Sequence, residues 1–156
     1  MQLLFYALFA AGIVAADQIT KYLTVANIAL GQRVEWMPGF LGLTYVQNTG
    51  AAFSSFEGMQ WLFALIFVVF TAAVIWEHRH NTMNFSAFDW WCIVAVYGGG
   101  LGNMIDRIRL GYVVDMIKTE FMVFPVFNVA DCFITCGCIA LMASQIFGMV
   151  KQFLKK

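Results

Sequence analysis

Two carboxylates in the C-terminal half of the chain have the type and the neighbours needed for acid–base chemistry. Asp115 follows the strand-like stretch 111–114, and Asp131 follows residues 127–130 and opens a long apolar run. Two carboxylates that share a site cannot both ionise easily, so one keeps a proton while the other acts as a general base on water. The sequence holds no Ser-His-Asp set, phosphate loop or HExxH motif as a rival catalytic group.

Each of these carboxylates, taken singly, also has an explanation without catalysis. Asp131 suits the first turn of a helix, where the macrodipole favours a negative charge, and Asp115 suits a loop. Taken together they are harder to explain in this way, because both precede or open segments that meet at the same membrane face. Asn128 stands beside them in the sequence. The pair is therefore the candidate catalytic group.

Three further polar clusters stand at the ends of apolar runs, where unpaired charges are costly. Asp17 and Lys21 lie four residues apart, which fits an ion pair on one helix face. The stretch 47–54 is predicted to form a turn, because it contains an Asn and a Gly, which favour turns. The glycines of 98–102 let a neighbouring helix approach closely. They do not explain Asn103 and Arg107, one helical turn apart, which form a binding surface for a carbonyl or a phosphate.

The elements that must position these residues follow from composition. Of the 156 residues 62% are hydrophobic and 12% are charged, against about 25% charged in a soluble domain. Nine Lys and Arg balance nine Asp and Glu, so no net basic field attracts nucleic acid. We therefore expect an all-α integral membrane protein with four transmembrane helices, in one domain over 1–156. The predicted spans are about 3–25, 58–76, 87–105 and 132–150, and a small strand-rich cap is formed by segments 26–57 and 106–130.

The orientation of these spans is not decided by counting charges. An even number of spans places both termini on one side, together with four cations, while the other side carries five. This distribution does not obey a simple positive-inside rule. The excess on the second side suggests that some of those cations serve the site.

With these motifs in order along the whole chain, the sequence resembles the lipoprotein signal peptidase (signal peptidase II) family of bacteria. One block alone would be weak evidence, whereas five in order are specific. Small departures are Cys132, where many members have Ser, and Met116, where Phe is more usual; neither falls on a catalytic position. The matching blocks are Asp17-Gln18-x-x-Lys21, Asn48-x-Gly50-Ala51-Ala52-Phe53-Ser54, Gly99-Gly100-x-x-Gly102-Asn103-x-x-Asp106-Arg107, Gly111-x-Val113-Val114-Asp115 and Phe127-Asn128-x-Ala130-Asp131.

The resemblance implies a four-helix intramembrane aspartyl endopeptidase of the bacterial inner (cytoplasmic) membrane. Both termini would be cytoplasmic, and the active site and the cap would face the periplasm. The substrate would be a prolipoprotein whose lipobox cysteine already carries diacylglycerol, cleaved just before that cysteine. No cofactor or metal is implied, and the cyclic peptide globomycin would inhibit. The catalytic dyad would be Asp115 and Asp131, and the substrate-binding residues would be Asn103, Arg107, Asn128, Asn48, Gly50, Asp17 and Lys21.

Two other classes of protein remain open from the residues alone. A small membrane transporter or proton-relay subunit also places Asp, Asn and Arg in its spans, although transport folds are usually larger and carry internal repeats. A non-enzymatic assembly subunit would explain the glycines but not the polar blocks. In the peptidase interpretation, the cap segment 43–56 would close over the substrate and exclude water.

Overall fold

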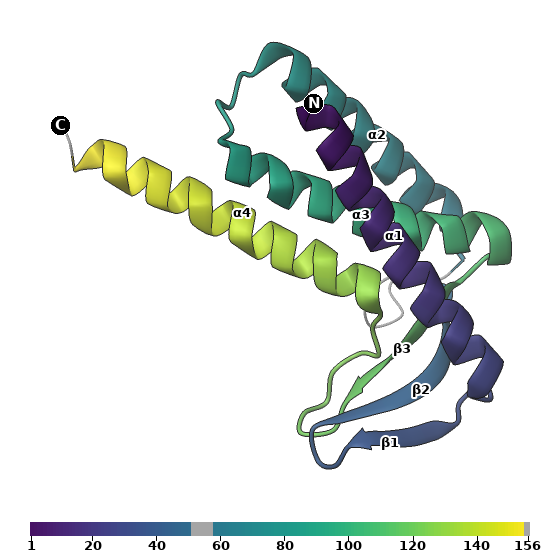
Figure 1. Cartoon of the computed structure of the whole chain (residues 1–156). Coiled ribbons are helices and arrows are strands. Elements are labelled where there is room, and N and C mark those ends of the chain that lie inside the picture. The colour runs from purple at the N-terminus through teal and green to yellow at the C-terminus, as the bar shows by residue number, and fades with distance from the viewer. Residues whose placement is uncertain (51–57, 155–156) are drawn as a thin grey trace.

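The chain folds into a helical bundle with a small antiparallel sheet at one end (Figure 1). The computed structural model describes residues 1–50 and 58–154. In that part of the chain, the sheet has the strand order β1-β2-β3. The elements in chain order are α1 (Gln2–Asn27), β1 (Arg33–Met37), β2 (Leu41–Asn48), α2 (Gln60–His80), α3 (Ala87–Leu110), β3 (Val113–Thr119) and α4 (Val129–Phe153).

Membrane-spanning character is clear for three of the helices. Among the described residues, α1, α2 and α4 are long and apolar enough to cross a membrane by length and composition. Helix α3 has the length but not the apolar character, because it carries glycines, Asn103 and several charges. It also has the most buried residues of any helix. A helix that packs mainly against other helices needs fewer lipid-facing side chains.

Glycines let α3 lie close to the helices on either side of it. A Cβ at Gly99 would come within 2.5 Å of the carbonyl oxygen of Ala130 at the start of α4. A Cβ at Gly102 would come within 2.5 Å of the Asp17 carboxylate on α1. The predicted role of this glycine cluster in close helix packing is therefore confirmed. These contacts bring the polar ends of α1, α3 and α4 together.

The sheet forms within the two segments that were predicted to make a strand-rich cap, 26–57 and 106–130. The end of the strand-like stretch 111–114 lies in β3, which pairs antiparallel with β2. In this register Asn48 faces Val113 and Val46 faces Asp115. Asn48 and Asp115 are therefore diagonal neighbours on one face of the sheet, within reach of each other's side chains. Met116 and other apolar residues of the sheet pack with Ile28, which directly follows α1. This contact attaches the sheet to the end of α1.

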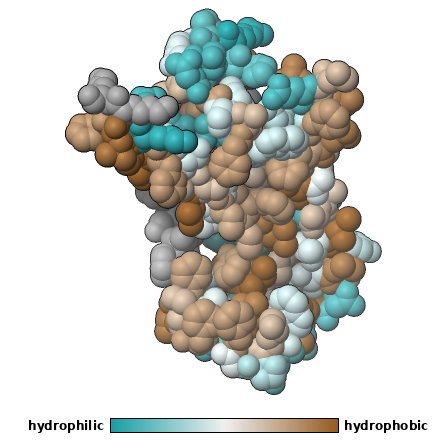
Figure 2. All heavy atoms as spheres, turned by 60° about the vertical axis from the view of Figure 1, so that its left-hand side comes forward, coloured by the Kyte–Doolittle hydropathy of each residue, from teal (hydrophilic) through white to brown (hydrophobic). Residues whose placement is uncertain are grey.

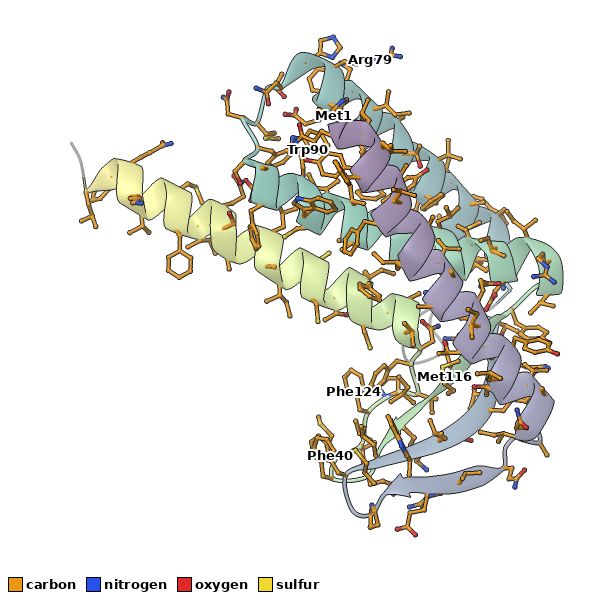
Figure 3. All side chains as sticks on the ribbon, in the orientation of Figure 1. Met1, Phe40, Arg79, Trp90, Met116 and Phe124 are labelled. Carbon is orange, nitrogen blue, oxygen red and sulfur yellow. The ribbon has the colours of Figure 1, made fainter. Side chains whose placement is uncertain are left out.

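The two ends of the molecule differ in character. The start of α1 and the end of α4 lie away from the sheet (Figure 1). Hydrophilic residues gather at the end where α2 finishes and α3 begins, and apolar residues cover the middle of the visible face (Figure 2). Arg79 lies at that hydrophilic end, while Phe40 lies at the opposite end, in the turn between β1 and β2 (Figure 3). A largely apolar middle between two ends fits a membrane protein.

Candidate active site

The N-terminus of α4 presents one of the two predicted catalytic carboxylates. Asn128 caps the helix: its side-chain oxygen accepts the backbone N–H of Asp131 at 2.9 Å. The Asp131 carboxylate in turn accepts the backbone N–H of Asn128 at 3.1 Å through Oδ2. This reciprocal capping box fixes the direction of the Asp131 side chain. The second oxygen of Asp131 remains available to partners from other elements.

The other carboxylate, Asp115, lies on β3 and is 2% exposed. Its Oδ2 accepts the side-chain N–H of Asn48 at 2.9 Å, and its Oδ1 accepts that of Asn128 at 2.7 Å. Burial raises the pKa of Asp115 to about 6; the Asn48 hydrogen bond opposes the rise, and the nearby negative charge of Asp131 adds to it. Asp115 therefore holds a proton more readily than an exposed aspartate.

Asn103 of α3 connects the two carboxylates. Its side-chain N–H donates to Oδ1 of Asp131 at 2.8 Å. Its oxygen accepts the side-chain N–H of Asn128 at 3.0 Å, and Asn128 also donates to Asp115. Two side-chain amides therefore link one carboxylate to the other: Asn103 of α3 contacts Asp131, and Asn128 contacts Asp115. The four residues come from α3, the start of α4 and β3.

Both carboxylates line a cavity of about 720 Å³. Phe124, which also lines it, lies between the start of α4 and the sheet (Figure 3). Most of the wall is apolar and comes from α2, α3, α4 and the segment that precedes α4. The polar lining residues are Asn48, Asn103, Arg107, Asp115, Asp131 and Thr135. The cavity thus combines a mostly apolar wall with a small set of polar groups, which is the usual form of a site for an apolar ligand with a polar reacting group.

Arg107 supplies the positive charge in this cavity. Its guanidinium donates to the Gly50 carbonyl at 3.1 Å and lies 4.3 Å from the centre of the Phe63 ring. The backbone N–H of Gly50 donates to the Asn48 side chain at 2.9 Å. Residues 51–54 of that motif, and residues 51–56 of the segment 43–56 that was predicted to close over the substrate, lie outside the described residues.

Behind the cavity, a buried ammonium joins two carboxylates. Lys21 is 3% exposed and lies 2.8 Å from Oδ2 of Asp17 and 3.0 Å from Oδ2 of Asp106. The ion pair predicted within one helix, Asp17 with Lys21, is confirmed, and it extends to α3. Asp17 also accepts the backbone N–H of Ala130 at 3.1 Å. The cluster therefore ties α1 to both α3 and α4.

Comparison with known proteins decides the family. A sequence model described as "Signal peptidase (SPase) II" matches residues 9–147. A lipoprotein signal peptidase of Enterococcus faecalis is 45% identical over 141 residues, which are 89% of this chain and 86% of that protein. One of Streptococcus pyogenes serotype M2 is 44% identical over 130 residues, with 83% and 84% covered.

The chain belongs to the signal peptidase II family. The resemblance seen in the sequence is thereby confirmed. Two solved structures, both described as a bacterial membrane enzyme determined by the in meso method, are each 32% identical to it. The match to the first structure has a TM-score of 0.84 and covers 97% of this chain and 91% of that protein's chain. The match to the second has a TM-score of 0.79 and covers 90% of this chain and 91% of that protein's chain. The helices and the family together identify a bacterial membrane protein.

The predicted site residues of this signal peptidase II member fall into two groups. Asn48, Asn103, Arg107, Asp115 and Asp131 line the cavity. Among the described residues, Gly50, Asn128 and the pair Asp17 and Lys21 are not part of this lining, but they form hydrogen bonds with it or with one another. Their assignment as substrate-binding residues stays a prediction.

Two residues outside the predicted set hold the same framework. Asp106 accepts the backbone N–H of Val114 at 3.0 Å, which fixes the strand that carries Asp115. Gln18 donates to Asp106 at 2.9 Å and to the Gly102 carbonyl at 3.2 Å. Both stand inside the sequence blocks that indicated the family. Their polar character within apolar runs was the signal that could have identified them.

Proposed function

We propose that the chain is an aspartic endopeptidase that removes the signal peptide from diacylglyceryl-modified prolipoproteins, cleaving just before the lipidated cysteine. Membership of the signal peptidase II family supports a peptidase acting on lipoprotein precursors. The observation that carries the aspartic mechanism is one pair of carboxylates, Asp115 and Asp131, lining one cavity from two elements.

In this mechanism water is the nucleophile. Asp115 carries the proton that the dyad shares, because burial and the charge of Asp131 raise its pKa to about 6. Asp131 is then the general base that removes a proton from water, while protonated Asp115 donates a hydrogen bond to the scissile carbonyl. Collapse of the tetrahedral intermediate breaks the C–N bond, and the leaving amine receives a proton from the dyad. The two groups titrate as a unit.

The hydrogen bonds around the dyad offer no acceptor for the proton that it carries. All four carboxylate oxygens accept an N–H group of the protein: two on Asp115 from Asn48 and Asn128, and two on Asp131 from Asn103 and the backbone of Asn128. An N–H donor cannot take up a proton. In this proposal the proton is therefore exchanged with the water and the substrate rather than with these amides.

The shape of the cavity supports an apolar, lipid-carrying substrate. Phe67 and Phe70 of α2 and Ile134 of α4 form part of its apolar wall. In this proposal the wall receives the apolar signal peptide and guides the acyl chains toward the lipid. Arg107 faces the same cavity and binds a backbone carbonyl of the peptide.

We further propose that α3 is the fourth membrane span, so that the single domain crosses the membrane four times. The start of α1 and the end of α4 lie away from the sheet (Figure 1). Both termini would then be cytoplasmic, and the sheet and the dyad would face the outer, periplasmic side of the inner membrane. Labelling of single cysteines by an impermeant reagent in intact cells, at Val123→Cys and at Lys151→Cys, tests this topology.

The activity is tested with purified protein in lipid nanodiscs and a synthetic lipobox peptide that carries diacylglyceryl-cysteine. Mass spectrometry is expected to find one cut, before the modified cysteine, and no cut in the unmodified peptide. Globomycin is expected to block the reaction. Absence of cleavage, or cleavage elsewhere, overturns the proposal.

The proton-relay alternative is tested on the same protein. A proton relay would acidify the lumen of proteoliposomes under a potassium diffusion potential without cutting the peptide. The peptidase proposal expects cleavage and no such proton flux.

A further inference from the structure

The three side-chain amides of the candidate active site all present the same end to the carboxylates. An asparagine amide carries an oxygen and an NH₂ group of similar size, so it can sit either way round unless its partners decide. Asn48, Asn103 and Asn128 each donate an N–H to Asp115 or Asp131. A reversed amide would place its oxygen against a carboxylate, which is repulsive. Each amide oxygen therefore needs a hydrogen-bond donor on the side away from the carboxylate, which fixes the orientation of the amide.

For two of the amides the backbone does this. The oxygen of Asn128 accepts the backbone N–H of Asp131 at 2.9 Å, as part of the helix cap. The oxygen of Asn48 accepts the backbone N–H of Gly50 at 2.9 Å. A backbone N–H can only donate, so each contact selects the amide oxygen and turns the NH₂ group toward Asp115.

Asn103 lacks this local solution, because it lies within α3, where the backbone N–H groups are already used in the helix. Two donors from other elements hold its oxygen instead: the ammonium of Lys21 on α1, 2.8 Å away, and the side-chain N–H of Asn128, 3.0 Å away. Lys21 is buried, and its two other contacts are the carboxylates of Asp17 and Asp106. An ammonium has three donors and no acceptor, and these three oxygens use all of them.

We propose that Lys21 is a positioning residue for the reaction: it fixes the Asn103 amide so that its N–H faces Asp131, the base. This inference rests on the proposed function, because it assigns Lys21 a role in that same site. It differs from the expectation that Lys21 binds substrate. The cavity wall includes Asn103 and Arg107 but, among the described residues, not Lys21.

The proposal makes a kinetic distinction. Without the ammonium, the Asn103 oxygen keeps only the N–H of Asn128, so the amide is held less firmly and its N–H faces Asp131 for less of the time. The chemical step is expected to slow by about tenfold to a hundredfold, as for loss of a hydrogen bond to a charged group. Substrate binding is unaffected, because Lys21 does not touch the substrate. A substrate-binding role would instead raise KM.

A double-mutant cycle on the lipidated peptide tests this. Lys21→Met, Asn103→Ala and the combined variant are compared with the unmodified protein for kcat and KM. We expect Lys21→Met to lower kcat at unchanged KM, and to cause no further loss when Asn103 is already alanine. Independent, multiplying losses, a raised KM, or an unchanged kcat for Lys21→Met each overturn the proposal.

A second pair of variants guards against misfolding, since Lys21→Met leaves buried carboxylates without their cation. Asp17→Asn combined with Lys21→Met keeps the net charge, and Asp17→Asn alone is its reference. The proposal expects Lys21→Met to lower kcat in the Asp17→Asn background as it does in the unmodified protein, and to cause no loss there once Asn103 is alanine. Losses from Lys21→Met and Asn103→Ala that multiply in this background overturn the proposal. Cleavage by the unmodified protein is the control. If it fails, the proposed function fails; if it succeeds and the cycle is additive, only the role of Lys21 fails.

Discussion

The chain contains two helix caps with the same local chemistry at opposite ends of the bundle. At the start of α3, Ser86 and Asp89 form a reciprocal capping box, with Ser86 N–H to Asp89 at 2.8 Å and Asp89 N–H to Ser86 at 3.2 Å. At the start of α4, Asn128 and Asp131 form the same motif. Trp90, the neighbour of Asp89, lies at the end away from Phe40 (Figure 3).

The difference between the two caps lies in their tertiary surroundings. The Asp89 carboxylate is buried and accepts the side-chain N–H of Gln145 on α4 at 3.0 Å. Asp131 lines a cavity together with Asp115 and accepts an amide from Asn103. A capping aspartate is therefore a structural group in one place and a candidate general base in the other, and the local motif does not distinguish them.

The strongest test of this comparison removes each carboxylate in turn. Asp131→Asn and Asp115→Asn are each expected to lower the cleavage rate on the order of 10³-fold or more, because the general base or the shared proton is lost. Asp89→Asn, the matched control at the other cap, is expected to retain cleavage. Rates are measured by mass spectrometry on folded protein. Normal turnover in either dyad variant would contradict the mechanism.

A second test moves Asp131 without changing it. Gly99→Ala places a methyl group 2.5 Å from the Ala130 carbonyl, so α3 and α4 must separate. Asp131 then shifts from Asn103, and we expect cleavage to fall by about 10²-fold, as for a displacement near 1 Å. Gly12→Ala is the control, because nothing lies within 4 Å of its added Cβ. Equal rates in the two variants would show that the close approach is not required.

A third test shifts the pH profile. Asp115 has a pKa of about 6, so in the proposed mechanism kcat/KM falls as the pH rises through this value. The Asn48 N–H stabilises the ionised form, and its loss in Asn48→Ala raises the pKa further. The falling limb should move to higher pH by about one unit. Asn27→Ala, which removes an exposed amide on α1, should not move it. A shift to lower pH would refute the assignment of the proton.

The smallest effect is expected at the structural cap. Ser86→Ala removes the side-chain oxygen that accepts the Asp89 N–H, at a cost of about 1 kcal/mol in unfolding free energy. Thermal unfolding in detergent should therefore begin at a lower temperature, while kcat/KM at low temperature stays unchanged. A large loss of activity would mean that this end of the bundle also serves the reaction.

Much of the fold could be predicted because its signals are local. The apolar runs predicted four helices, and the structure extends most of them by a few residues, as far as His80 in α2 and Leu110 in α3. Among the described residues, three of these helices are long and apolar enough to cross a membrane. Helix α3 is not among them, because its glycines and polar groups lower its apolar character. Strand β1 was not singled out, since its residues are exposed and its order comes from pairing with β2.

The sequence by itself determined the membrane class, the helix cap at Asp131, the ion pair of Asp17 with Lys21 and the family. Each of these depends on neighbours within a few residues or on the order of motifs along the chain. Only the tertiary structure decided that Lys21 contacts Asn103 across 82 residues and that Asn48 contacts Asp115 across 67. Such contacts depend on the packing of α1 on α3 and on the register of β2 with β3, and no local pattern specifies either.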